Sequence, residues 1–114
     1  MIRREEVNVA TPIILDVDPG HDDAIAILMA AASPAIELLA VTCVAGNAPL
    51  ANTQENARKI LTLAGVTAVP VAAGLDRPLL RPLVTAPQVH GQTGLDGPAI
   101  PAPAVELDPR HAVD

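Results

Sequence analysis

An apolar run that passes through an acidic turn directly into an apolar helix constrains the fold of this chain more than any other feature. Residues 13–15 are Ile-Ile-Leu, and four aspartates follow within the next eight residues, divided by Pro19 and Gly20. Residues 24–32 are then nearly all apolar. Apolar residues at successive positions predict a strand that is buried on both faces, as parallel strands usually are. A buried strand, a turn and a helix in this order indicate an α/β fold.

The same alternation of strand and helix continues as far as residue 74. The predicted strands cover residues 12–17, 36–44 and 68–73, and the predicted helices cover residues 22–32 and 49–64. The second helix is amphipathic, because its apolar side chains recur on one stripe. The order β-α-β-α-β predicts a parallel, Rossmann-like α/β unit with right-handed crossovers.

Residues 75–114 lose this periodicity and form a Pro/Gly-rich C-terminal segment. Seven prolines exclude a long helix there. Glycines surround His90 in residues 85–97, which predicts a mobile loop able to close over a site. Residues 98–109 are predicted to be an extended linker, and residues 110–114 resemble the first turn of a helix. We therefore expect one partial domain, with a core over 12–74 followed by a loop and a truncated tail over 75–114.

Composition excludes several classes of function. The formal net charge is −6 and basic residues do not cluster, which argues against a nucleic-acid-binding surface. Phe, Tyr and Trp are absent, so the chain has no aromatic platform on which bases could stack. Ser33, Pro34 and Glu37 interrupt the apolar residues 24–46, so no membrane span is expected. The single cysteine, Cys43, cannot form an internal disulfide, which fits the predicted cytoplasmic location.

The acidic turn predicts a metal or catalytic site. Asp16, Asp18, Asp22 and Asp23 bring four negative charges together, which lowers stability unless something neutralises them. A hard divalent cation that prefers oxygen ligands is the natural neutraliser. Capping of the following helix explains one or two of these carboxylates, but it does not explain all of them.

Loops after the three predicted strands should meet at one edge of the sheet. The acidic turn follows the first strand, Ala-Gly-Asn at residues 45–47 follows the second, and Ala-Gly at residues 73–74 follows the third. The carboxyl ends of parallel strands open on one crevice, where ligands bind. Asn47 has two interpretations, as a cap of the second helix or as a ligand-binding amide. Its expected position beside the acidic turn favours the ligand.

The run Asp-Val-Asp-Pro-Gly-His-Asp-Asp-Ala at residues 16–24 resembles the N-terminal signature of the inosine-uridine-preferring nucleoside hydrolases. The likeness continues through residues 37–42, Gly46-Asn47, residues 70–74 and His90-Gly91, and it covers the chain from about residue 12 onward. The resemblance implies the N-terminal part of the nucleoside hydrolase fold. It also implies hydrolysis of the N-glycosidic bond of purine or pyrimidine ribonucleosides, which yields free base and ribose.

The resemblance implies catalytic and metal-binding roles for three aspartates. Asp18 would be the general base and would also contact Ca²⁺, the implied cofactor. Asp23 would be a second calcium ligand, and Asp16 would steady Asp18 and the turn from outside the site. The chemistry suits these residue types, because a bound cation lowers the pKa of water while a carboxylate removes its proton. Carboxylates also stabilise a transition state that resembles an oxocarbenium ion.

The resemblance implies that a small-molecule nucleoside is the partner of this site. Asp22 and Asn47 would contact the ribose, and His90 would lie near the nucleobase. Family members are well over twice as long as this chain, and their later segments supply further calcium ligands and ribose contacts. We therefore expect an N-terminal fragment with little or no hydrolytic activity of its own, whose full-length relatives form homo-oligomers.

Two alternatives remain open at this point. An Asp-x-Asp after a buried strand also occurs in haloacid-dehalogenase-like phosphatases, which use an Asp nucleophile and magnesium, but here Pro19-Gly20 replaces the Thr or Val that this motif favours. The second alternative is an inactive, truncated fragment with residual calcium binding. An EF-hand fits least, because the acidic turn follows a strand and lacks the downstream Glu of that loop.

Overall fold

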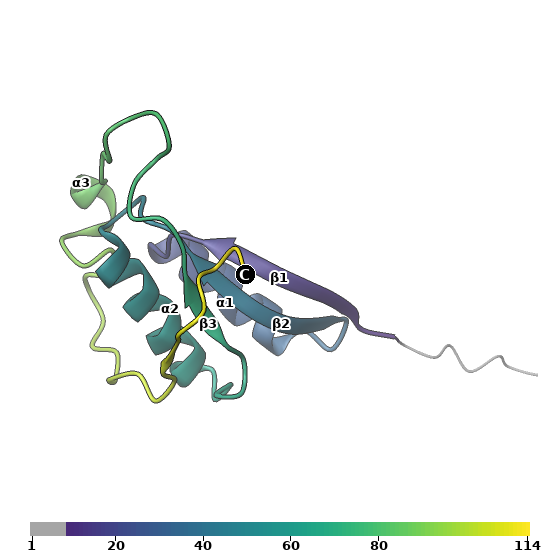
Figure 1. The fold of residues 1–114 in the computed structure, drawn as a ribbon. Coiled ribbons are helices and arrows are strands. Elements are labelled where there is room, and N and C mark those ends of the chain that lie inside the picture. The colour runs from purple at the N-terminus through teal and green to yellow at the C-terminus, as the bar shows by residue number, and fades with distance from the viewer. Residues whose placement is uncertain (1–8) are drawn as a thin grey trace, which may run out of the picture.

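Four parallel strands form the sheet of the computed structural model, which describes residues 9–114 (Figure 1). The strands are β1 (Thr11–Val17), β2 (Ile36–Cys43), β3 (Val71–Ala73) and β4 (Leu107–Asp108). The helices are α1 (His21–Ala32), α2 (Leu50–Leu63) and the single turn α3 (Pro87–His90). The predicted α/β class and the β-α-β-α-β order are therefore confirmed.

The strands lie in the order β1-β2-β3-β4, so each strand pairs with its neighbour in the chain. Val17 pairs with Cys43, and Cys43 pairs with Ala73. These three residues are the last of their strands, so the carboxyl ends of β1, β2 and β3 form one level edge. The loops that follow the three strands leave the sheet side by side.

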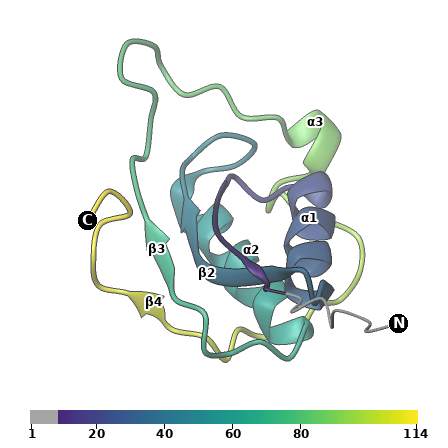
Figure 2. The same ribbon diagram turned by 90° about the vertical axis from the view of Figure 1, so that its right-hand side faces the viewer.

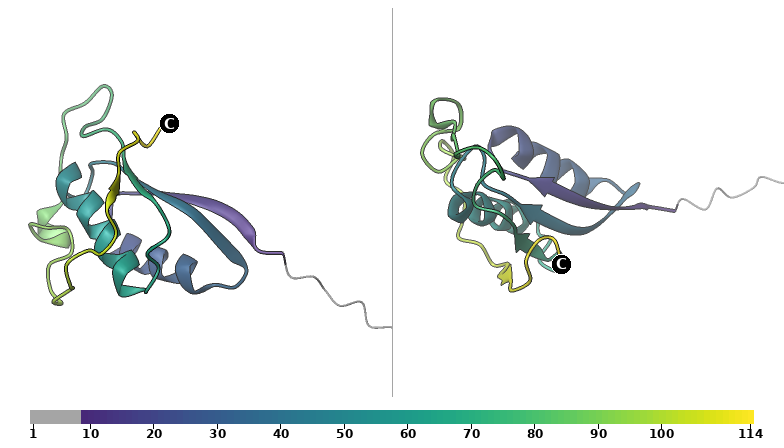
Figure 3. Two further views of the ribbon diagram at one scale, coloured as in Figure 1. Left: turned by 60° about the horizontal axis from the view of Figure 1, so that its bottom comes forward. Right: turned by 45° about the horizontal axis from the view of Figure 1, so that its top comes forward.

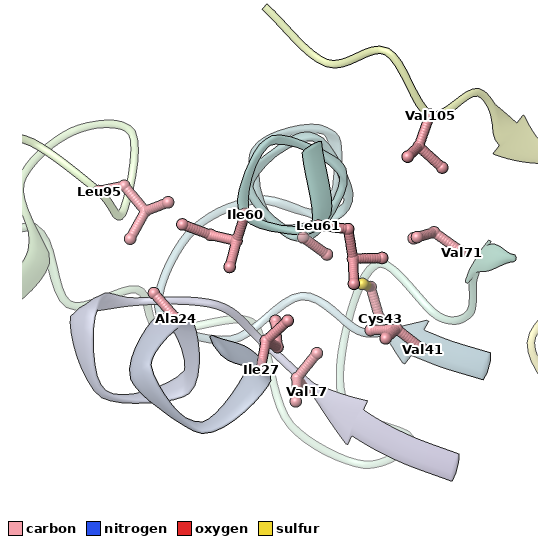
Figure 4. Packing of buried hydrophobic residues seen from close by; sticks show 11 residues of the cluster. Val17, Ala24, Ile27, Val41, Cys43, Ile60, Leu61, Val71, Leu95 and Val105 are labelled. Carbon is pink, nitrogen blue, oxygen red and sulfur yellow. The ribbon is translucent and has the colours of Figure 1, made fainter. Parts of the chain in front are cut away.

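Both long helices cover the same face of the sheet (Figure 2). Figure 4 shows the core between the helices and the sheet: Ile27 of α1 lies beside Val17 of β1, and Leu61 of α2 lies beside Cys43 of β2. The opposite face carries no helix within the described residues, and Ile14 of β1 is 61% exposed there. The expectation that the strands are buried on both faces is thus wrong for this part of the chain. Burial instead alternates along β2, as in a sheet covered on one side.

The segment after β3 differs most from the expectation. β3 begins at Val71, since Pro70 has no N–H to donate to a ladder, although its carbonyl accepts the Val41 N–H at 3.0 Å. Residues 98–109 are not a free linker, because β4 extends the sheet beside β3 and Val105 is buried against it (Figures 3 and 4). Leu95 is also buried in the core. Periodicity misses such contacts, since they come from single apolar residues in irregular backbone.

A loop between β3 and α3 projects away from the fold at the carboxyl edge of the sheet (Figure 2). Leu79 and Leu80 near its tip are 86% and 96% exposed. Within residues 9–114, no helix combines the length and apolar character that crossing a membrane requires.

Candidate functional site

Asp18 and Asn47 meet where β1 and β2 end. The backbone N–H of Asn47 donates to Oδ2 of Asp18 at 2.8 Å, and Nδ2 of Asn47 donates to the Asp18 carbonyl at 3.0 Å. The helix α2 begins after Pro49 and has no side-chain cap. The capping interpretation of Asn47 is therefore wrong, and the residue instead anchors both the backbone and the carboxylate of Asp18.

Gly46 allows the Asp18 carboxylate to lie against the β2 loop. A Cβ placed on Gly46 would collide with Oδ2 of Asp18. The φ angle of Gly46 is not positive, so the need for glycine here comes from close approach rather than from backbone strain. The Gly-Asn pair thus works as one unit, in which glycine makes room and asparagine donates.

Asp23 reaches back from α1 to the start of the acidic turn. The backbone N–H of Asp18 donates to Oδ2 of Asp23 at 3.0 Å. Asp23 thus bridges the two ends of the turn instead of capping the helix, because the N-cap residue is Gly20, which has no side chain. Partial burial raises the pKa of Asp23, and the negative charges of Asp18 and Asp22 raise it further. The main cause of the raised pKa is thus burial of the carboxyl group, and neighbouring negative charge is a smaller one.

The remaining two aspartates of the turn face different surroundings. Asp16 is exposed at the end of β1, and its Oδ1 accepts a hydrogen bond from Oγ1 of Thr42 on β2 at 2.7 Å. Asp16 thus braces the ends of two strands, and its hydrogen bond goes to Thr42 rather than to Asp18. Asp22 is exposed in the first turn of α1, where the helix dipole favours a carboxylate.

His90 lies over the acidic turn although it is distant from it in the sequence. Its Nδ1 accepts the backbone N–H of His21 at 3.2 Å, and the two imidazole rings stack with centroids 5.5 Å apart. A Cβ on Gly20 would collide with the His90 ring. The structure therefore places His90 against the Pro-Gly turn. His90 is the last residue of α3, which follows the projecting loop in the chain.

Three residues that the sequence does not single out, His21, Thr42 and Asn56, contact the acidic turn or the loop of His90. His21 lies inside the acidic motif, but the motif itself does not reveal that its side chain contacts the 90s loop. Thr42 holds Asp16. Asn56 is buried on α2 with Thr53, Ala57 and Ile60, at helical spacings of three and four residues. A polar amide on that buried stripe was the available signal for Asn56.

Asp18 and Asp23 are the residues that could hold a cation. Their carboxylate oxygens are the ligands that hard divalent ions such as Ca²⁺ prefer, and calcium takes roughly six to eight of them. In the stretch from residue 9 to residue 114, no group of three or more His, Cys, Asp or Glu side chains is arranged to hold a metal ion. The two carboxylates therefore suit a cation only as part of a ligand set that water, substrate or other protein oxygens complete.

Comparison with known proteins identifies relatives over nearly the whole chain. The family model for inosine-uridine preferring nucleoside hydrolases matches residues 13–114. A pyrimidine-specific ribonucleoside hydrolase, RihA, of Photobacterium profundum is 55% identical over 106 residues, which are 93% of this chain and 34% of that protein. RihA of an Enterobacter species is 52% identical over the same length, again 93% of this chain and 34% of the relative.

A solved structure agrees with these sequence matches. The purine-preferring ribonucleoside hydrolase from Gardnerella vaginalis superposes with a TM-score of 0.83 at 31% identity, over 90% of this chain and 34% of that one. The chain thus spans about a third of the length of the relatives it matches. With a family model that extends from β1 to the last residue, the chain belongs to the inosine-uridine preferring nucleoside hydrolase family.

Proposed function

We propose that this chain forms the acidic part of the active site of a ribonucleoside hydrolase, which cleaves an N-glycosidic bond to release base and ribose. One observation carries the proposal: the Asp18 carboxylate is held at the joined ends of β1 and β2 by the Asn47 N–H at 2.8 Å, beside Asp23. The family match over residues 13–114 supports the class of reaction. The acidic cluster supports it too, because carboxylates stabilise the positive charge that develops on the sugar.

In this proposal Asp18 is the general base. The Asn47 N–H engages Oδ2, so Oδ1 is the oxygen that takes a proton from the attacking water. Asp18 and Asp23 would together hold Ca²⁺, which when bound would lower the pKa of a coordinated water. Asp16 would keep the end of β1 aligned with β2 through Thr42.

The nucleoside would lie along the carboxyl edge of the sheet. Asp22 is exposed in the first turn of α1, where its carboxylate can accept hydrogen bonds from ribose hydroxyls. Nδ2 of Asn47 is engaged with the Asp18 carbonyl, so Oδ1 of Asn47 is the atom that would accept from ribose. His90, held over Gly20, would contact the nucleobase through its imidazole.

We propose pyrimidine ribonucleosides as the substrate class. The relatives named RihA are described as pyrimidine-specific and are 55% and 52% identical to this chain, whereas the purine-preferring Gardnerella enzyme is 31% identical. We also propose a cytoplasmic location, a homo-oligomeric state for the full-length relatives, and calcium and ribose contacts in those relatives from segments that this chain does not match.

A chimera tests this function directly. Residues 13–114 would replace the corresponding segment of Photobacterium RihA, and ribose release would be measured with uridine, cytidine and inosine in the presence of calcium. We expect hydrolysis, with uridine and cytidine preferred to inosine, whereas the 114-residue chain alone should release little or no ribose. A folded chimera that hydrolyses none of the three nucleosides would contradict the proposed function.

A further inference from the structure

The loop around His90 is docked onto both helices by polar contacts. Nε2 of His21 on α1 lies 2.8 Å from the carbonyl oxygen of Asp96. On α2, Nδ2 of Asn52 donates to the carbonyl of Gln92 at 3.2 Å. A segment whose glycines suggest mobility is therefore tied at several points, and the most buried of these ties is made by Asn56.

Asn56 is 3% exposed, and its amide nitrogen joins two segments that are distant in the chain. Nδ2 donates one hydrogen bond to the Pro19 carbonyl in the acidic turn at 3.1 Å and another to the Thr93 carbonyl in the loop at 2.7 Å. Both protons of the amide are thereby used, one on each segment. Pro19 is itself fully buried, so its carbonyl has little access to water as a substitute partner.

The backbone of the loop packs closely against the Asn56 amide. A Cβ on Gly94 would lie 3.0 Å from Nδ2 of Asn56 and 3.1 Å from the Pro19 oxygen. The φ angle of Gly94 is +89°, a conformation that glycine tolerates and other residues rarely adopt. The loop therefore approaches the turn closely enough that α2, the turn and the loop meet at a single side chain.

We propose that Asn56 is a positioning residue that sets the acidic turn and the His90 loop at one fixed separation. The proposal rests on the proposed function, in which the turn supplies the general base Asp18 and the ribose contact Asp22, and His90 contacts the nucleobase. Both ends of one substrate must then be presented at once, and Asn56 is the side chain bonded to both segments. Its contacts are donated only by Nδ2, so an acceptor in its place would repel both carbonyls.

Hydrogen exchange of the 114-residue chain, followed by NMR, tests the coupling without any need for activity. Asn56→Ala removes both bonds, and Asn56→Asp keeps the size of the side chain but turns the donor into an acceptor. Asn52→Ala is the matched control that loses a loop contact but no contact to the turn. Leu61→Val trims the core on the same helix and reports a general loss of stability.

In both Asn56 variants we expect amide hydrogen exchange in the acidic turn and in the loop of His90 to quicken by about tenfold or more, relative to exchange at the amides of β2. The reporting amides, each hydrogen-bonded in the wild type, are Asp18 in the turn and Gln92 and Asp96 in the loop. Asn52→Ala should affect the loop amides alone, and Leu61→Val should quicken exchange at β2 together with the rest. Exchange at the turn that stays as slow in Asn56→Asp as in the wild type would overturn the proposal.

A second variant decides the matter if the Asn56 variants do not fold. Gly94→Ala pushes on Nδ2 from the loop side, so exchange at the Asp18 amide of the turn should change along with exchange in the loop. A change confined to the loop would refute the coupling.

Titration with calcium and uridine is a separate experiment. Absence of binding by the wild type counts against the proposed function only. Binding that is equally tight in wild type and Asn56→Asp counts against the positioning role.

Discussion

The Asn47 N–H donates to the Asp18 carboxylate at 2.8 Å while the Asn47 side chain returns a second hydrogen bond to the Asp18 carbonyl at 3.0 Å. Two residues from the ends of neighbouring strands thus hold each other at both backbone and side chain. The contact exists because Val17 pairs with Cys43 at the last rung of the β1–β2 ladder, which brings the two following loops together. A carboxylate fixed in this way is ready to accept a proton with little rearrangement.

Gly46→Ala should displace the Asp18 carboxylate. The new methyl group would clash with Oδ2, and such overpacking costs about 1–3 kcal/mol. If the carboxylate moves to relieve the clash, the same free energy lost from calcium binding is roughly a fivefold to 150-fold loss of affinity. Calorimetric titration with calcium measures the change. Gly65→Ala is the control, because φ is +72° there but no atom lies near the added Cβ. It should lower stability while leaving affinity unaltered, and equal affinity in both variants would disprove the steric argument.

Calcium binding by the chain alone should be weak. Asp18 and Asp23 would supply only part of the roughly six to eight oxygens that calcium takes, so we expect a dissociation constant near the millimolar end of the range known for calcium sites. Asp23→Asn should weaken binding further, since it removes one charged ligand. Calorimetry that detects no heat of binding to wild type at millimolar calcium would contradict the cation assignment for these residues.

Asp23→Asn should also stabilise the chain at neutral pH when a chelator is present. Burial raises the pKa of Asp23 in the folded state, so its contribution to stability is fully present below the unfolded-state pKa and is lost as pH rises through the folded pKa. Asparagine keeps the acceptor for the Asp18 N–H without the charge. In urea unfolding measured from acidic to neutral pH, the free energy of unfolding of the variant should increase relative to that of the wild type as pH rises. A difference that is constant across this range would argue against a raised pKa.

Cys43 should be chemically inert in the folded chain. It is fully buried, and burial together with the charges of Asp16, Asp23 and Asp18 raises the pKa of its thiol to about 12. The thiolate is the reactive form, so labelling with iodoacetamide at pH 8 should proceed only through unfolding. Labelling in urea provides the reference rate. A folded-state rate close to that reference would show that the thiol is accessible.

Self-association should follow the exposed apolar surface of α1. Ile25 and Met29 lie one turn apart on this helix and are 57% and 67% exposed. β3 offers no comparable surface, because β4 pairs with it and Val71 is fully buried. Size-exclusion chromatography should show oligomers whose population falls in Ile25→Lys/Met29→Lys. The control is Leu79→Lys/Leu80→Lys in the projecting loop. A fall in the oligomer population in that control alone would assign self-association to the loop.

The sequence predicts the parallel fold well, because hydrophobic runs reveal buried strands. It also predicts that Asn47 lies beside the acidic turn at one edge of the sheet, where the Asn47 N–H contacts Asp18. It predicts less well what depends on side chains that meet across the fold. The loop of His90 carries glycines and was expected to move, yet Asn56 and His21 bind it to the helices. Likewise, β4 is a strand because its backbone pairs with that of β3, whereas its two residues alone show no strand pattern. Such contacts join residues far apart in the chain, and periodicity contains no information about them.

We propose that Asp18 is the general base of a nucleoside hydrolase site. The most direct measurement is ribose release from uridine by the chimera with RihA, compared with the same chimera carrying Asp18→Asn, which keeps the shape of the side chain. We expect kcat to fall by about 10²-fold or more while the circular dichroism spectrum and melting temperature remain close to those of the unmutated chimera. A folded Asp18→Asn chimera that turns over uridine within a few-fold of its parent would contradict the account.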